Sequence, residues 1–187
     1  TRKSTAGNRR GSHYTARKWG PHVGVRVRLA TFASFVDESF TVGVRMRDVA
    51  SSTVKGYLMY VVPTSLTEAN VTLARADGTS APNLLGTETV PVPLAVGDEF
   101  EWRAVGDEIS AWHKPNGGEW TRIGLVYDAT YPEAGYVGLE FTGSQNLRVD
   151  DLRVQHYDVP AGEPRFVAAG TGQSALTSPL TVPVPTD

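Results

Sequence analysis

The stretch that decides the fold is residues 135–157, Gly-Tyr-Val-Gly-Leu-Glu-Phe-Thr-Gly-Ser-Gln-Asn-Leu-Arg-Val-Asp-Asp-Leu-Arg-Val-Gln-His-Tyr. Apolar residues alternate on both sides of a Gly-Ser-Gln-Asn turn signal, which predicts two strands joined as a β-hairpin. The alternation slips by one residue at Asp150-Asp151, and such a slip predicts a β-bulge. A hairpin with one apolar face buries that face on another sheet, so the upstream strands are expected to complete a sandwich.

The same alternation recurs upstream of this stretch. Residues 23–29 and 40–47 each place apolar side chains on one face and polar side chains on the other. In the second of these strands, Met46 is expected to point inward and Arg45 outward. Residues 56–62 are a nearly continuous apolar run ended by proline, which is typical of a central strand.

The clearest hairpin follows a loop-rich passage. Residues 79–97 contain three prolines and are expected to hold at most one short edge strand. Residues 100–104 and 109–113 then alternate around a Gly-Asp turn, and a second turn precedes residues 120–127. Short strands separated by turn signals, without an amphipathic helix, predict an all-β antiparallel β-sandwich.

Composition divides the chain into three parts. Eight of the 18 basic residues precede the first acid, Asp37, and residues 1–20 are expected to form an extended basic arm that packs on another chain or domain. Residues 21–158 are the expected jelly-roll domain. Residues 159–187, rich in small residues and proline, are expected to be a linker or the start of a following module. Because the chain begins with Thr1, it is expected to be a segment of a longer protein.

Composition also narrows the classes of function. No run approaches the roughly 18 apolar residues of a membrane helix, and the chain has no cysteine for disulfides, a thiol nucleophile or a thiolate metal site. A basic arm binds nucleic acid in some proteins, but this arm lacks a known nucleic-acid-binding motif and a set of aromatic residues on which bases could stack. We therefore expect no nucleic-acid binding and favour docking of the arm onto acidic neighbouring subunits.

Several sequence elements between Val23 and Tyr157 resemble the concanavalin A-like lectin/glucanase jelly roll, in particular its laminin-G-like and 3-keto-disaccharide-hydrolase-like branches. They are Gly56-Tyr57-Leu58, the hairpin from Phe100 to Trp112, Trp120 with Asp128, and Gly135-Tyr-Val-Gly-Leu139 leading into Val149-Asp-Asp-Leu-Arg-Val154. The resemblance implies a concanavalin A-like jelly roll. It does not imply an activity, because this superfold includes lectins, glycanases, adhesion modules and virion parts.

A second resemblance covers the whole chain. An arginine-rich arm, a jelly roll, and a tail such as the run from Val167 to Thr177 are similar in style to the minor tail proteins of bacteriophages of actinobacteria. This resemblance implies a structural module of a virion tail, with other tail subunits as partners.

The sequence contains no catalytic motif and no metal or cofactor motif. The glucanase branch of the superfold requires Glu-x-Asp-x-x-Glu on one strand, and this pattern is absent. The pairs Asp150-Asp151 and Asp37-Glu38 offer too few oxygens for Ca²⁺. The four histidines are scattered, without a base or ligand partner at motif spacing. We therefore expect a protein that is not an enzyme and that binds neither a metal nor a cofactor.

The candidate binding residues lie on the hairpin of residues 98–114. Alternation places Glu99, Glu101, Arg103 and Trp112 on its outer face, where the two carboxylates are expected to be solvated. A tryptophan among charged residues is suited to stacking on a sugar ring, so these four residues are the predicted glycan site. The alternative is that a loop or a neighbouring subunit covers Trp112.

Together these features predict a non-catalytic jelly-roll module of a larger surface assembly. The favoured setting is a bacteriophage tail or tail tip, where the module is expected to act as a scaffold or to bind host cell-surface glycan, without membrane insertion. The alternative is the carbohydrate-binding accessory module of a secreted bacterial glycoside hydrolase.

Overall fold

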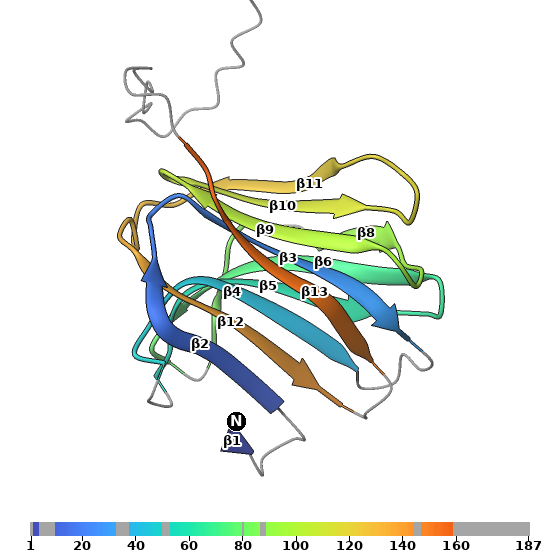
Figure 1. The fold of residues 1–187 in the computed structure, drawn as a ribbon, viewed down its shortest axis with the longest axis horizontal. Coiled ribbons are helices and arrows are strands. Elements are labelled where there is room, and N and C mark those ends of the chain that lie inside the picture. The colour runs from blue at the N-terminus through green and yellow to red at the C-terminus, as the bar shows by residue number, and fades with distance from the viewer. Residues whose placement is uncertain are drawn as a thin grey trace, which may run out of the picture.

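The chain folds into two antiparallel sheets that pack face to face (Figure 1). The computed structural model describes residues 2–3, 10–32, 38–49, 53–79, 81–86, 89–143 and 147–158. These residues contain thirteen strands and no helix, which confirms the predicted all-β sandwich. No helix long and apolar enough to span a membrane occurs within these ranges.

The larger sheet has eight strands in the order β1-β2-β12-β4-β5-β6-β7, with β8 also paired to β6. The strands of this large sheet are β1 (Arg2–Lys3), β2 (Arg10–Trp19), β12 (Gly135–Thr142), β4 (Ser39–Arg47), β5 (Lys55–Pro63), β6 (Glu68–Asp77), β7 (Asn83–Leu84) and β8 (Val90–Pro93). The predicted central strand, β5, lies between β4 and β6, and two short strands occur where at most one was expected.

The smaller sheet has five strands in the order β11-β10-β9-β3-β13. The strands of this small sheet are β11 (Thr121–Tyr127), β10 (Glu108–Lys114), β9 (Glu99–Val105), β3 (Val23–Thr31) and β13 (Arg148–His156). The predicted hairpin is confirmed as β9 and β10, which pair in register from Glu108–Val105 to Lys114–Glu99.

The core fills the space between the sheets with alternate side chains from both. Val25, Val27 and Leu29 of β3 are fully buried, as is Trp102 of β9. The rings of Phe40 and Phe100, one from each sheet, meet edge to face with centroids 5.6 Å apart. Burial of each large apolar side chain stabilises the fold by about 1.5–3 kcal/mol, so the apolar core between the two sheets is the main source of stability.

Residues 135–157 do not form the predicted hairpin. β12 pairs with β2 and β4 in the large sheet, whereas β13 pairs with β3 in the small sheet (Figure 1). Alternation predicts a buried face for each strand but does not say which sheet the strand joins. Five residues separate β12 from β13 in the sequence, and a connection of this length suits a crossing of the roughly 10 Å between stacked sheets as well as a turn. The predicted bulge is confirmed, because the β13 register shifts between Asp150 and Arg153 and Asp151 has φ +52°.

The basic arm is not separate from the sandwich over its whole length. Arg10–Trp19 forms β2, which pairs with β12 along the large sheet. The expectation that residues 1–20 pack only on another chain is therefore wrong for this segment. A strand at a sheet edge is held by backbone hydrogen bonds, which leave little apolar periodicity in the sequence. The predicted linker at residues 159–187 lies outside the described residues.

A bulge in β4 reverses the predicted directions of two side chains. The pairing of β4 with β5 shifts between Val44 and Arg47, and Arg45 has φ +51°. Arg45 is fully buried, and its guanidinium donates to the carbonyl oxygens of Pro21 and Tyr131. Met46 is buried too, but it lies beside Gly43, on the face opposite Val42 and Val44 of the core. The prediction of an inward Met46 and an outward Arg45 is wrong because the extra residue of a bulge changes the alternation.

Candidate functional site

The outer face of the small sheet carries a row of interacting side chains. Backbone register places Arg26 of β3 beside Glu101 of β9, Glu101 beside Trp112 of β10, and Trp112 beside Arg122 of β11. Their chain neighbours Phe100 and Trp102 point into the core, so this row points away from it. With the residues that contact the row, it forms the outer cluster: Arg26, Glu99, Glu101, Arg103, Trp112, Lys114, Trp120 and Arg122.

Glu101 is the centre of the outer cluster and is fully buried. Its carboxylate accepts hydrogen bonds from Nη2 of Arg103 at 2.9 Å and Nη2 of Arg26 at 3.3 Å, and also from Gln155 and Tyr157. Burial by itself would raise the pKa of Glu101, but the hydrogen bonds from Arg103 and Tyr157 outweigh it and the pKa is lowered. The prediction that this carboxylate is solvated is wrong, since four donors from three strands and the end of β13 cover it.

Tyr157 reaches Glu101 because Gly24 has no side chain. A Cβ at Gly24 would lie 2.7 Å from the Tyr157 ring and 2.8 Å from the Glu101 carboxylate. The backbone N–H of Tyr157 also donates to the carbonyl of His22 at 3.0 Å. The chain leaving β13 is thereby held against the outer face of the small sheet.

Trp112 is half-buried and its indole is fixed from two sides. Nε1 donates to Oγ of Ser110 at 3.1 Å, and the Arg103 guanidinium lies 4.1 Å from the ring centroid. From the opposite neighbouring strand, Arg122 reaches within 5.9 Å of the same ring. Cation–π contacts of this kind are worth about 0.5–1 kcal/mol at exposed sites, so they hold the ring without enclosing it.

Trp120 and Glu99 complete the outer cluster. The Arg26 guanidinium lies 4.5 Å from the centroid of the Trp120 ring, which is also half-buried. Glu99 pairs with Nζ of Lys114 at 3.0 Å and with Arg26 at 3.9 Å. The structure therefore brings all four predicted site residues to one face, but only Trp112, Glu99 and Arg103 keep partial exposure there.

Sequence reasoning did not identify Arg122 as a neighbour of Trp112. Uninterrupted pairing of β10 with β11 would have placed Ile123 opposite Trp112, but the register shifts between Ala111 and Trp112. This bulge turns Ile123 toward the core and brings Arg122 to the outer face. The contribution of Tyr157 was missed for another reason, since it depends on the path of the chain after β13.

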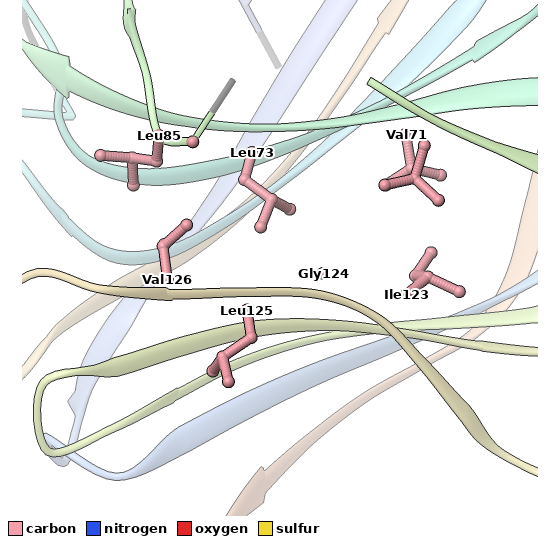
Figure 2. A pocket seen from close by; sticks show the side chains of 9 residues that line it. Val71, Leu73, Leu85, Ile123, Gly124, Leu125 and Val126 are labelled. Atoms are coloured by element: carbon pink, nitrogen blue, oxygen red, sulfur yellow. The ribbon is translucent and has the colours of Figure 1, made fainter. Parts of the chain in front are cut away.

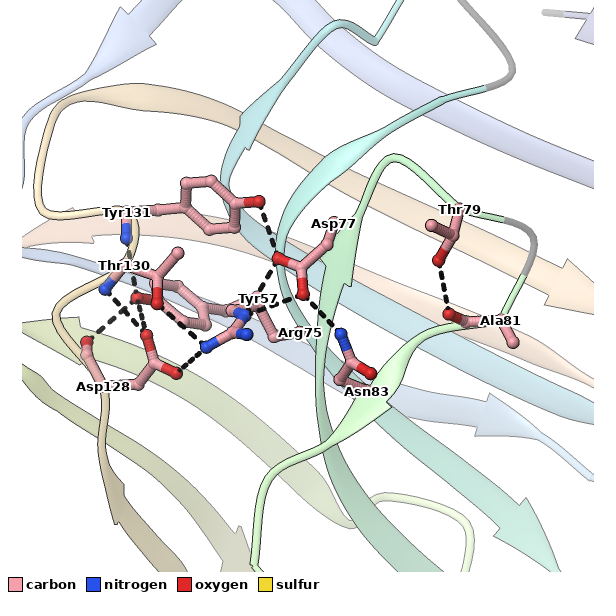
Figure 3. Close-up of polar contacts among 9 residues, drawn as sticks. All are labelled: Tyr57, Arg75, Asp77, Thr79, Ala81, Asn83, Asp128, Thr130 and Tyr131. Carbon is pink, nitrogen blue, oxygen red and sulfur yellow. Dashed lines mark hydrogen bonds and ion pairs between the residues drawn. The ribbon is translucent and has the colours of Figure 1, made fainter.

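A second polar cluster joins the connection after β11 to β5 and β6 (Figure 3). This end cluster consists of Tyr57, Arg75, Asp77, Asp128, Thr130 and Tyr131. Arg75 of β6 binds Asp77 at 2.9 Å and also contacts Asp128, which follows β11. The Tyr57 hydroxyl donates to Asp128 at 2.8 Å, and the Tyr131 hydroxyl donates to Asp77 at 2.7 Å. These bonds tie the connection after β11 to strands of the large sheet. We assign them a structural role, because each carboxylate is engaged by several donors.

The end cluster shifts the pKa values of its members. Burial would raise the pKa of Asp77 and of Asp128, but hydrogen bonds, among them those from Tyr131 to Asp77 and from Thr130 to Asp128, outweigh it, and both pKa values are lowered. Burial raises the pKa of Tyr57 and of Tyr131 to about 12, and the adjacent carboxylates add to this effect. The network therefore favours ionised aspartates and neutral tyrosines.

An apolar cavity of about 290 Å³ lies between β6 and β11, at an open edge of the sandwich (Figure 2). Val71 and Leu73 face Ile123, Gly124 and Val126 across it in Figure 2. It has no charged lining residue and lies away from the outer cluster. The structure assigns it no ligand.

The other candidates from the sequence do not form a site. Asp151 pairs with Arg28 at 3.7 Å and lies 3.9 Å from Arg153. Nε2 of His113 lies 3.1 Å from Asp98 in the core, and Asp98 also accepts the backbone N–H groups of Ala95 and Asn116. Among the described residues, no three His, Asp or Glu side chains come together as metal ligands. Asp37 lies outside the described residues.

Comparison with solved structures agrees with this architecture. The legume lectin-like domain from Entamoeba histolytica superimposes with a TM-score of 0.59 at 12% identity, covering 81% of this chain and 80% of that one. The chain has a lectin-like β-sandwich fold. The carbohydrate-binding module CBM66 from Bacillus subtilis gives a TM-score of 0.55 at 11% identity, with 75% and 78% coverage. The exoplasmic/lumenal domain of VIP36 gives 0.61 at 8% identity, with 82% and 76% coverage.

This lectin-like sandwich confirms the predicted jelly-roll fold, and identities this low establish the fold alone. No protein-family model matches the chain, and no curated protein is detectably similar to it in sequence.

Proposed function

We propose that this lectin-like sandwich is a non-catalytic module that binds glycan on the outer face of its small sheet. The observation that carries the proposal is the pair of half-buried tryptophans, Trp112 and Trp120, within a cluster of charged side chains. Leaving part of an indole in contact with water forgoes hydrophobic stabilisation, so such rings on a polar face favour a ligand-binding role.

The chemistry of the outer cluster suits a saccharide. A sugar ring has apolar C–H faces that pack on an indole and hydroxyl groups that need hydrogen-bond partners. The partly exposed Glu99, Lys114 and Arg122 supply an acceptor and donors beside Trp112. Glu101 acts as a positioning residue, because its hydrogen bonds hold Arg26 beside the Trp120 ring and Arg103 beside the Trp112 ring.

The same geometry supports a protein without glycosidase activity. A glycosidase needs two available carboxyl groups, one of them with a raised pKa so that it acts as an acid. Glu101 is fully buried, accepts four hydrogen bonds and has a lowered pKa, which are opposite properties. Glu99 is already paired with Lys114 and Arg26.

Substitution of the tryptophans tests the proposal. The chain would be screened on a glycan array, and the best ligand would be titrated by calorimetry against Trp112→Ala and Trp120→Ala. We expect each variant to lose at least about tenfold in affinity, since stacking on an aromatic ring contributes roughly 1–3 kcal/mol by analogy with bases on aromatics.

Tyr127→Ala is the matched control, because Tyr127 is 66% exposed on β11 and lies outside the outer cluster. This control should bind as tightly as the unaltered chain. Melting temperatures of all three variants should stay within a few degrees of one another. Absence of binding to any glycan, or full binding by both tryptophan variants, would refute the proposed function.

For the biological setting we propose a virion tail, in which this module contacts other tail subunits and a host cell-surface glycan. The support is the sequence resemblance to minor tail proteins of actinobacterial phages, together with the basic residues near the N-terminus. Immunogold labelling of tails by an antibody raised against this chain would support this setting.

The alternative setting is the accessory module of a secreted glycoside hydrolase, favoured by the fold similarity to CBM66. Isolation of the chain from culture medium as part of a glycanase would support the alternative and exclude the tail.

A further inference from the structure

The outer cluster carries more positive than negative charge. Four of its eight residues are basic and two are acidic, whereas the whole chain has a net charge of −2. The outer cluster therefore carries a net positive charge, although the chain as a whole is negatively charged. A local excess of one sign attracts a ligand of the other sign.

Both carboxylates in the cluster are already paired. Glu99 binds Lys114 and Arg26, and Glu101 binds Arg26 and Arg103. Arg122 is exposed, and it forms no ion pair within the part of the chain that the structure describes. Its guanidinium is thus a cation available to a ligand next to the Trp112 ring.

Hydrogen-bond donors also exceed acceptors on this face. A guanidinium has five N–H donors and no acceptor, and three arginines belong to the cluster. Glu101 already accepts four hydrogen bonds, and Arg122 donates to no carboxylate within the described residues. A ligand group that only accepts hydrogen bonds, such as a carboxylate or a sulfate, complements this excess.

We infer that the glycan bound by the outer cluster is anionic, a saccharide that carries uronate or sulfate groups. Arg122 pairs with the acidic group, and the adjacent Trp112 contacts the C–H face of the same sugar residue. This inference rests on the proposed function, since it names the class of glycan that the same face takes.

The test compares ligands that differ only in charge. Calorimetry with the full chain would use a uronate oligosaccharide, a sulfated oligosaccharide and a neutral oligosaccharide of equal length, with polyphosphate as a polyanion without sugar. At least one acidic sugar should bind about tenfold or more tightly than the neutral one, because a charged hydrogen bond contributes about 1.5–3 kcal/mol. The preference should weaken as salt is added.

Arg122→Gln should remove most of the preference for the acidic sugar over the neutral one. Lys18→Gln is the control, since it removes one exposed charge from β2 in the large sheet. Equal binding of neutral and acidic sugars would overturn the inference and leave the proposed function standing. Polyphosphate binding as tight as that of the acidic sugar, or an equal loss in Lys18→Gln, would also overturn it. Failure of every glycan would overturn both.

Discussion

At the scale of single residues, Glu101 is the least expected feature of the molecule. A carboxylate on the outer face of a sheet is ordinarily solvated, yet this one is fully buried. Loss of hydration is offset by two guanidinium groups, an amide and a phenol. Gly24 makes the arrangement possible, since any larger residue there would exclude the Tyr157 ring.

Glu101→Gln should therefore destabilise the fold. The amide has nearly the same size, but it leaves Arg103 without a carboxylate and Arg26 with only the more distant Glu99. We expect a loss of about 2–3 kcal/mol in the free energy of unfolding, below the range for a fully buried pair because both arginines are partly exposed. Urea denaturation would measure it. Glu119→Gln, at an exposed loop position, should change the value by no more than about 0.5 kcal/mol.

At the scale of elements, bulges decide which side chains reach each face. The bulge in β4 turns Arg45 inward, and the bulge in the pairing of β10 with β11 turns Arg122 outward. The bulge in β4 depends on close contacts from its two neighbouring strands. Gly135 of β12 and Gly56 of β5 let their strands approach the backbone of Arg45. A Cβ at Gly135 would lie 2.4 Å from the carbonyl carbon of Arg45, and a Cβ at Gly56 would lie 3.0 Å from its carbonyl oxygen.

Gly135→Ala tests the close approach of β12 to the bulge. The added Cβ would overlap main-chain atoms of Arg45, which cannot rotate away, so we expect a loss of stability of about 1–3 kcal/mol. Thermal and urea unfolding would both show it. At Gly20 an added Cβ would lie 3.4 Å from the His156 ring, so Gly20→Ala should have little effect. Equal stability of the two variants would contradict the proposed role of Gly135.

At the scale of the whole molecule, the two sheets are joined by the apolar core and by the end cluster around Arg75. The end cluster depends on ionised Asp77 and Asp128 and on neutral Tyr57 and Tyr131. These opposite requirements confine the stabilising effect of the cluster to a range of pH.

We expect the melting temperature to be highest at intermediate pH and to fall at both extremes. The lowered pKa values of the aspartates stabilise the fold above their ordinary pKa of 3.8, and this contribution is lost as the pH falls below it. The tyrosine pKa values, raised from 10.0 to about 12, give a contribution that is complete below pH 10 and lost as the pH rises toward 12.

Asp128→Asn should lower the melting temperature at pH 7 and make it fall less as the pH is lowered, because one of the two carboxylates of the end cluster is gone. Melting curves recorded from pH 2 to 12 would test the fall of the melting temperature at both low and high pH. An acid limb as steep in Asp128→Asn as in the unaltered chain would show that other groups control acid stability.

Much of the fold was readable from the sequence, because alternation and turn residues report which side of a strand is buried. The hairpin of β9 and β10, the central position of β5 and the bulge in β13 were predicted correctly. The same alternation placed Trp112 and Arg103 on one outer face. These features are local, since each depends on residues close together in the chain.

The partners of each strand were decided only in the tertiary structure. Backbone hydrogen bonds are the same whichever strand supplies them, so nothing in residues 135–157 says that β12 and β13 join different sheets. For the same reason β2 was mistaken for part of a free arm. The burial of Glu101 required Arg26, Gln155 and Tyr157 to arrive from distant parts of the chain. Sequence alone determined which side chains face outward where the strands are regular. Packing of distant segments determined where bulges change that alternation and which outward side chains a ligand can reach.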